Sequence, residues 1–135
     1  MRPDGIFVNS DIEVEHWFLD NRQDVRSSYA LEGIATEFDI QGLELDWTVV
    51  AWDADLRYRD GFWDYKSFKG SKWQTVVDAT RQLYLKNSYR VLLTRARQGM
   101  IIFIPLGDET DATRPPSYYN STFEYLRKIG LQVID

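Results

Sequence analysis

The sequence contains no cysteine and a single histidine, His16, among its 135 residues. The absence of cysteine excludes a disulfide scaffold and any thiolate metal site, and one histidine cannot supply a multi-histidine metal centre. No run approaches the roughly 18 apolar residues of a membrane-spanning helix, and the first residues lack the basic start and apolar core of a signal peptide. We therefore expect a cytoplasmic protein that does not associate with a membrane.

The sequence also lacks the phosphate-binding motif G-x-x-x-x-G-K-[ST], and no hydrophobic strand candidate ends in an Asp-Glu pair that could hold Mg²⁺. These two features supply the groups that bind and activate ATP in P-loop enzymes. We therefore expect that this chain alone binds neither ATP nor Mg²⁺.

Acidic side chains outnumber basic ones, which gives a formal net charge of -5. The imbalance lies in residues 1–70, which carry 15 acidic and 7 basic side chains, whereas residues 71–135 carry 6 acidic and 9 basic ones. Phosphate neutralisation by basic groups supplies most non-specific affinity for nucleic acid. The chain alone is thus a poor DNA binder, and we expect any contact with nucleic acid to occur within a larger assembly.

Apolar runs alternate with helical patterns along the chain. Two runs without polar alternation, Trp47–Trp52 and Met100–Pro105, predict strands that are buried on both faces. Shorter strands are expected at Leu31–Thr36 and Leu131–Ile134. Helices are expected over Val14–Leu19, over Lys72–Arg97 with a stop at Gly99, and over Ser117–Ile129 with Gly130 as the C-terminal cap, while Asp53–Ser71 is expected to be a long loop. The pattern predicts one α/β domain over residues 1–135, with a mainly parallel sheet flanked by helices.

A polar segment around Gln41-Gly42 lies between two of the strand candidates. A strand that runs into a glycine lets the backbone approach a ligand closely. Gln41 and Glu44 would then project polar groups at the carboxyl edge of the sheet, where α/β folds bind ligands. The alternative is an ordinary strand, loop and strand with a glycine turn.

A basic segment, Tyr89–Arg97, precedes the second buried strand candidate. Arg95 is placed there to reach out of a rigid scaffold, and its planar guanidinium suits phosphate oxygens. The alternative is a solvated basic helix end, which also favours the helix dipole.

Taken together and in this order, the two segments resemble superfamily 1 helicases. Thr36 followed by Gln-Gly-Leu-Glu and an apolar strand is similar to motif V, and Leu-Leu-Thr-Arg-Ala-Arg before a second apolar strand is similar to motif VI. The segments Asp55–Gly61 and Asn87–Arg95 resemble a narrower group, the Schlafen group 3-like DNA/RNA helicase family of uncharacterised bacterial ATPases. The resemblance covers about residues 30–105 and departs at Phe38, where many superfamily 1 members have a histidine.

The resemblance implies that the chain is the second, C-terminal RecA-like domain of a DNA/RNA helicase-like NTPase, with a three-layer fold. It also implies that the isolated chain has no ATPase activity. Arg95 would be the arginine finger, which stabilises charge on the γ-phosphate across an interdomain cleft. Gln41, Gly42 and Glu44 would line the nucleotide cleft, and Thr36 would lie near the nucleic-acid backbone. An N-terminal Walker A/B RecA-like domain would complete the site for ATP and Mg²⁺, so this chain is either a fragment or a chain split from that partner.

The segment Asp55–Trp63 interleaves arginines with aromatic residues, a mixture that suits stacking on unpaired bases. On this basis Arg57 and Arg59 are candidate nucleic-acid-binding residues. The alternative for the same segment is a packed lid or an interdomain contact.

Two other functions remain open from the sequence. The first is a non-enzymatic α/β module that recognises a protein or a nucleic acid through the Asp55–Trp63 segment. The second is a metal-dependent nuclease built on the loop acids, although solvated side chains are the expected state of those acids: Asp39, Glu44, Asp46, Asp53 and Asp55.

Overall fold

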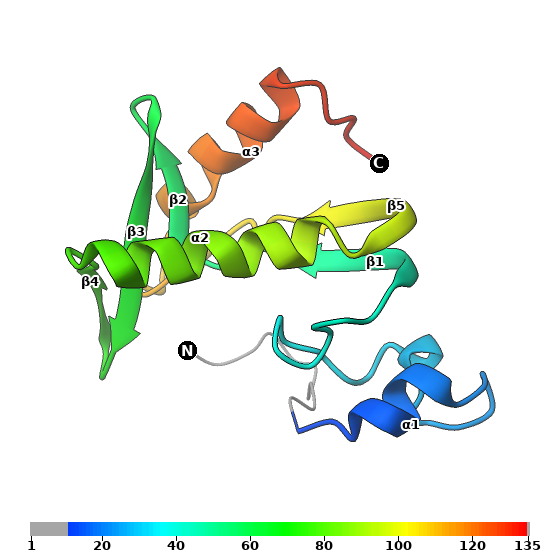
Figure 1. Cartoon of the computed structure of the whole chain (residues 1–135). Coiled ribbons are helices and arrows are strands. Elements are labelled where there is room, and N and C mark those ends of the chain that lie inside the picture. Colours follow the sequence, from blue (N-terminus) through cyan, green and yellow to red (C-terminus); the bar gives the residue numbers. More distant parts are fainter. Residues whose placement is uncertain (1–10, 135) are drawn as a thin grey trace.

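The structure is a computed structural model of the chain, and it describes residues 11–134. Its elements are arranged around one long helix, α2, that runs alongside two small sheets (Figure 1). In chain order they are α1 (Val14–Leu19), η1 (Ser28–Ala30), β1 (Leu45–Ala51), β2 (Leu56–Arg59), β3 (Phe62–Lys69), β4 (Lys72–Thr75), α2 (Ala79–Leu93), β5 (Ala96–Phe103), η2 (Pro116–Tyr118) and α3 (Asn120–Lys128). No helix within this part of the chain is long and apolar enough to cross a membrane.

The strands form a parallel pair and an antiparallel sheet. β1 pairs with β5 in parallel, with Val49 opposite Ile101 and Ala51 opposite Phe103. β2, β3 and β4 form an antiparallel meander. The α/β class predicted from the sequence is confirmed, and within residues 11–134 parallel pairing is limited to β1 and β5.

The antiparallel sheet replaces the long loop expected over Asp53–Ser71, so that prediction was wrong. β2 and β3 are joined by a two-residue turn at Asp60-Gly61, with φ angles of 52° and 93°. Positive φ at both central residues is the mark of a type I′ turn, which matches the twist of a hairpin. Gly70, with φ of 62°, begins the next two-residue turn, between β3 and β4.

Helix α2 is shorter at both ends than the helix expected over Lys72–Arg97. It begins after Asp78, whose side chain accepts a hydrogen bond from the Arg81 N–H at 2.8 Å and so caps the helix. The residues before this cap form β4, and those after Thr94 enter β5. Gly99 is therefore not a helix stop. It lies in β5 under the Trp47 ring, where a Cβ atom would collide with that ring.

The two short strands expected near the ends of the chain are wrong. Leu31–Thr36 contains a single bridge residue, Gly33, and the segment after α3 has no strand pairing up to residue 134. The cap at Gly130 is confirmed, because this residue has φ of 109° and its N–H donates to the Arg127 carbonyl at 3.1 Å.

The hydrophobic core joins α2 and α3 to both sheets. Its buried residues are Trp52, Leu56, Tyr89 and Leu126, which come from the end of β1, from β2, from α2 and from α3. The Trp52 and Tyr89 ring centroids are 4.5 Å apart. This cluster fixes the hairpin and α3 at the carboxyl end of β1.

The parallel pair is covered on one face only within the described chain. Val50 is buried, whereas the side chains of the opposite face are exposed, with Trp47 at 66% and Phe103 at 58%. The expectation of strands buried on both faces is therefore wrong for these residues. Apolar parallel strands normally have both faces covered.

A hydrogen bond at Thr122 gives a test of how α3 is held. Thr122 is fully buried, and its hydroxyl oxygen accepts from the Tyr58 N–H at 3.0 Å. Thr122→Val keeps the shape but leaves this N–H without an acceptor, so we expect a loss of about 1–3 kcal/mol in the free energy of unfolding. Urea denaturation measures it. Thr80→Val, at an exposed position of α2, is the control, and equal midpoints for the two variants would contradict the assignment.

Candidate nucleotide and nucleic-acid interface

Two loops that carry predicted site residues meet at the amino edge of the parallel pair. The loop from Thr36 to Glu44 leads into β1, and Arg95 directly precedes β5. Because β1 and β5 are parallel, the two strands begin at the same edge, and the Leu45 N–H donates to the Arg95 carbonyl at 3.2 Å. The carboxyl edge predicted for Gln41 and Glu44 is wrong, since it required the strand at Leu31–Thr36 that does not form.

The loop that leads into β1 is a compact turn with an accessible backbone. The Thr36 N–H and hydroxyl both donate to Oδ2 of Asp39 at 2.7 Å. These two bonds stabilise the ionised carboxylate and hold the pKa of Asp39 below its ordinary value, and the bond from the hydroxyl has the larger effect. Gly42 has φ of 86° with open space beside it, so glycine is needed there for its conformation. Gln41 and Glu44 are exposed on either side.

Arg95 is half-buried beside this loop, and its Nε atom is enclosed. That nitrogen has no hydrogen-bond partner among residues 11–134. A buried donor without an acceptor costs folding free energy, and such donors in native proteins need an explanation such as a bound group. The geometry leaves a guanidinium with spare donor capacity at the edge of the domain.

Two side-chain contacts connect the loop with the elements around Arg95. Nη1 of Arg97 lies 3.6 Å from Oε2 of Glu44, although both side chains are mostly exposed and such a pair contributes little stability. The Ser88 hydroxyl of α2 donates to Oε1 of Glu37 at 2.8 Å. The structure thus brings together the two segments that the sequence singled out as site candidates.

The arginines of the second candidate segment have opposite environments. Arg57 is 8% exposed, and its Nε donates to the Ala54 carbonyl at 2.6 Å. Its guanidinium carbon lies 3.3 Å from the ring centroid of Tyr118, and burial lowers the pKa of Arg57. Arg59 is 71% exposed and lies 3.4 Å from Asp60. Arg59 is therefore open to a ligand at the surface, whereas Arg57 can act only from within a pocket wall.

The aromatic residues of the hairpin mostly pack on one another. The Tyr58 ring stacks on Tyr125 of α3 with centroids 3.9 Å apart, and Trp63 meets both rings edge to face. Phe62, beside the turn, stays 60% exposed. Tyr58 and Trp63 are therefore packed against α3, which is the alternative to stacking on unpaired bases.

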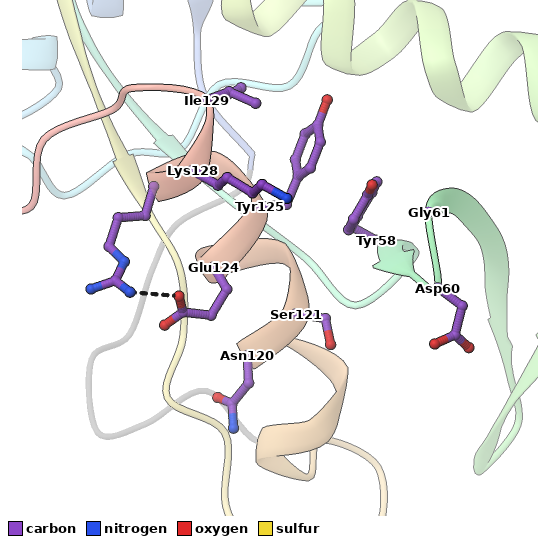
Figure 2. A pocket seen from close by; sticks show the side chains of 10 residues that line it. Tyr58, Asp60, Gly61, Asn120, Ser121, Glu124, Tyr125, Lys128 and Ile129 are labelled. Carbon is purple, nitrogen blue, oxygen red and sulfur yellow. Dashed lines mark hydrogen bonds and ion pairs between the residues drawn. The ribbon is translucent and has the colours of Figure 1, made fainter.

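A groove of about 880 Å³ separates the hairpin turn from α3 (Figure 2). Tyr58 and Asp60 lie on one side, while Asn120, Ser121 and Glu124 lie on the other. Sequence reasoning missed this groove, because its two walls are separated by about sixty residues and no local pattern connects them. The only signal for its first wall was the Asp60-Gly61 turn.

A half-buried acid, Asp55, follows the carboxyl end of β1. Oδ1 of Asp55 accepts from the Tyr89 hydroxyl at 2.6 Å. Burial raises the pKa of the Asp55 carboxyl to about 6, although the Tyr89 bond acts in the opposite direction. Burial of the Tyr89 hydroxyl raises the pKa of Tyr89, and the negative charge of Asp55 raises it further. Across residues 11–134, no three histidine, aspartate or glutamate side chains converge on a position that could hold a metal ion.

Residues 5–105 match the family described as Schlafen group 3, DNA/RNA helicase domain. The chain belongs to this family. No curated protein matches it, and no solved structure matches it. Membership in a helicase domain family suggests nucleic-acid binding.

The Schlafen group 3 match includes all of the predicted site residues and all five strands of the described chain. It ends before η2 and α3, and α3 supplies one wall of the groove. The predicted site residues within the match are Thr36, Gln41, Gly42, Glu44, Arg57, Arg59 and Arg95.

The raised pKa of Asp55 makes the stability of this Schlafen group 3 domain depend on pH. The folded chain holds the Asp55 proton up to about pH 6, whereas the ordinary pKa is 3.8. The free energy of unfolding therefore falls as pH rises through this window, by up to about 3 kcal/mol from this group. Asp55→Asn still accepts from Tyr89 but cannot ionise, so we expect the variant to gain stability over the native chain as pH rises.

Urea denaturation at several pH values between 4 and 7 measures this difference. Asp46→Asn, at an exposed position of β1, is the matched control. A constant difference between the native chain and Asp55→Asn across the window would contradict the burial of this proton.

Proposed function

We propose that the chain is the C-terminal motor half of a superfamily 1 DNA/RNA helicase-like NTPase that acts in the cytoplasm. In the complete protein it forms the second RecA-like domain, a three-layer fold. The observation that carries this proposal is the parallel β1–β5 pair, which brings the motif V-like loop and the motif VI-like arginine to one edge through the bond from Leu45 to Arg95.

Arg95 acts as the arginine finger of the complete motor. Its guanidinium is half-buried, and its Nε lacks an acceptor among the described residues. A phosphate oxygen supplies such an acceptor, and a rigidly held guanidinium stabilises the charge that develops during phosphoryl transfer. Arg95 therefore donates to the γ-phosphate of an ATP molecule held mainly by the partner domain.

The loop before β1 lines the same nucleotide cleft. Gln41 offers an exposed amide, the backbone at Gly42 is unobstructed, and Glu44 is close to Arg97. These donors and acceptors fit the ribose and phosphate groups of a nucleotide. No group of acids within residues 11–134 converges to hold Mg²⁺, so the ligands for Mg²⁺ and the phosphate cradle come from the N-terminal Walker A/B domain.

Of the other candidate residues, Arg59 contacts nucleic acid directly. Arg59 is exposed at the hairpin and suits a backbone phosphate. Thr36 lies in the loop that reaches the nucleotide cleft, where it can position that loop beside the nucleic-acid track. Arg57 supports the hairpin from inside and lines a pocket, and its enclosed Nη2 atom has no hydrogen-bond partner among residues 11–134.

The groove between the hairpin and α3 favours a second candidate function, a non-enzymatic binding module. Its walls join the aromatic side chain of Tyr58 to polar side chains of α3, among them Asn120 and Glu124. A partner that lacks a Walker motif and binds at this groove without any dependence on nucleotide would favour this function over the motor.

The role of Arg95 is tested by reconstituting the motor. The chain alone is expected to show no ATPase activity, and mixing it with the Walker A/B domain of the same protein is expected to produce activity. Arg95→Ala should lower kcat by about a thousandfold or more, because the charge on the transferring phosphoryl group loses its guanidinium.

The control for this test is Arg90→Ala, an exposed arginine of α2 that is one turn before the end of the helix. This variant should keep nearly full activity. Full activity in Arg95→Ala would overturn the assignment of the finger.

A further inference from the structure

A second pocket, of about 530 Å³, adjoins the groove of Figure 2 at the hairpin. It shares Tyr58, Asp60 and Ser121 with that groove but extends toward β3, β4 and η2. Basic and hydroxyl side chains converge on it from separate elements, namely Arg57, Arg59, Lys66, Ser117, Tyr118 and Ser121.

Arg57 forms the inner wall of this pocket. It is more than nine-tenths buried, and its Nη2 atom has no hydrogen-bond partner among residues 11–134. Its Nε is already bonded to Ala54, and the rings of Tyr118 and Trp73 hold the guanidinium at 3.3 Å and 5.1 Å from their centroids. The guanidinium is thus fixed in orientation while part of its donor capacity stays unused.

Among the three cations that line the pocket, Arg57 is the one without an ion-pair partner in residues 11–134. Nζ of Lys66 lies 2.9 Å from Oδ2 of Asp64, and Arg59 lies 3.4 Å from Asp60. No carboxylate of the described chain lies within ion-pair distance of Arg57. The lining therefore carries one net positive charge, and a phosphodiester carries one negative charge.

We propose that this pocket binds a single phosphate group, with the guanidinium of Arg57 and the hydroxyls of Ser117, Tyr118 and Ser121 as donors. A planar guanidinium fork fits phosphate oxygens. An anion also offsets the cost of a buried cation. A phosphodiester of a nucleic-acid strand is the source that rests on the proposed function, and a free phosphate is the other source of the same chemistry.

The pocket is a product of the C-terminal segment. Ser117, Tyr118 and Ser121 lie beyond residue 105, where the family match ends, and α3 brings them to the hairpin through the Thr122 bond to Tyr58. The site therefore combines a hairpin of the helicase domain with a wall that the family match does not include.

The test uses the full ¹⁵N-labelled chain, titrated separately with inorganic phosphate and with a short single-stranded oligothymidylate. The Nε–H resonance of Arg57 reports on the pocket itself, and fluorescence anisotropy measures the affinity for the oligonucleotide. Ser121→Glu places a carboxylate at the pocket mouth, at an exposed position in the first turn of α3, where an acid favours the helix. Ser71→Glu, in the turn between β3 and β4, is the matched control with the same change in charge.

We expect both ligands to shift the Arg57 resonance, and we expect Ser121→Glu to weaken oligonucleotide binding about tenfold through repulsion of the phosphate. Ser71→Glu should change the affinity less than about twofold, since exposed charges at a distance are screened. Arg59→Gln should lower the slope of log K against log salt concentration by about one, which is the value for one phosphate contact.

The possible results separate this proposal from the proposed function. A response to phosphate with no oligonucleotide binding supports the pocket, assigns it to free phosphate, and counts against the nucleic-acid part of the proposed function. Oligonucleotide binding that leaves the Arg57 resonance and the Ser121→Glu affinity unchanged overturns the pocket and leaves the proposed function standing. The absence of any response to either ligand overturns the pocket.

Discussion

The packing of Tyr89 against Trp52 is the contact on which the relation between the two sheets depends. Trp52 follows β1, and its indole N–H donates to the Leu56 carbonyl in β2 at 2.7 Å. Tyr89 belongs to α2, packs on Trp52 and donates to Asp55 between the two strands. One aromatic contact therefore holds the helix, the end of the parallel pair and the start of the hairpin. Leu126 closes the cluster from α3, so the positions of the groove and the adjoining pocket depend on it.

Two arginines of the chain carry an enclosed nitrogen without an acceptor among residues 11–134: Nε of Arg95 and Nη2 of Arg57. Folding normally satisfies enclosed donors, because each unsatisfied one costs about 1–3 kcal/mol. A cost of that size is offset where a ligand or a partner brings the missing acceptor. The two arginines lie at different ends of β1, one before β5 and the other in β2, so they are suited to different anions.

Local patterns in the sequence were sufficient for the elements that depend on local interactions. The strands expected at Trp47–Trp52 and Met100–Pro105 are present as β1 and β5, although β5 begins earlier, at Ala96, and the helices near both ends are present. The hairpin was missed because charged and aromatic residues in Asp53–Ser71 suggested a loop, although Asp60-Gly61 is a strong hairpin signal. Gln41 and Arg95 lie at the same edge of the sheet because β1 pairs with β5, which is a tertiary contact. The groove likewise forms because α3 packs beside β2, which lies about sixty residues earlier in the chain. Neither relation produces a periodic pattern in the sequence.

The polarity of the parallel pair also sets a distance. The loop residues and Arg95 lie where β1 and β5 begin, whereas Trp52, Asp55 and the hairpin lie where β1 ends. β1 has seven residues, which corresponds to a length of about 23 Å. A nucleotide at one end and a phosphate at the other would therefore never touch a common side chain. Coupling between the two ligands would therefore require a movement of β1, β5 and α2, which extend from one site to the other.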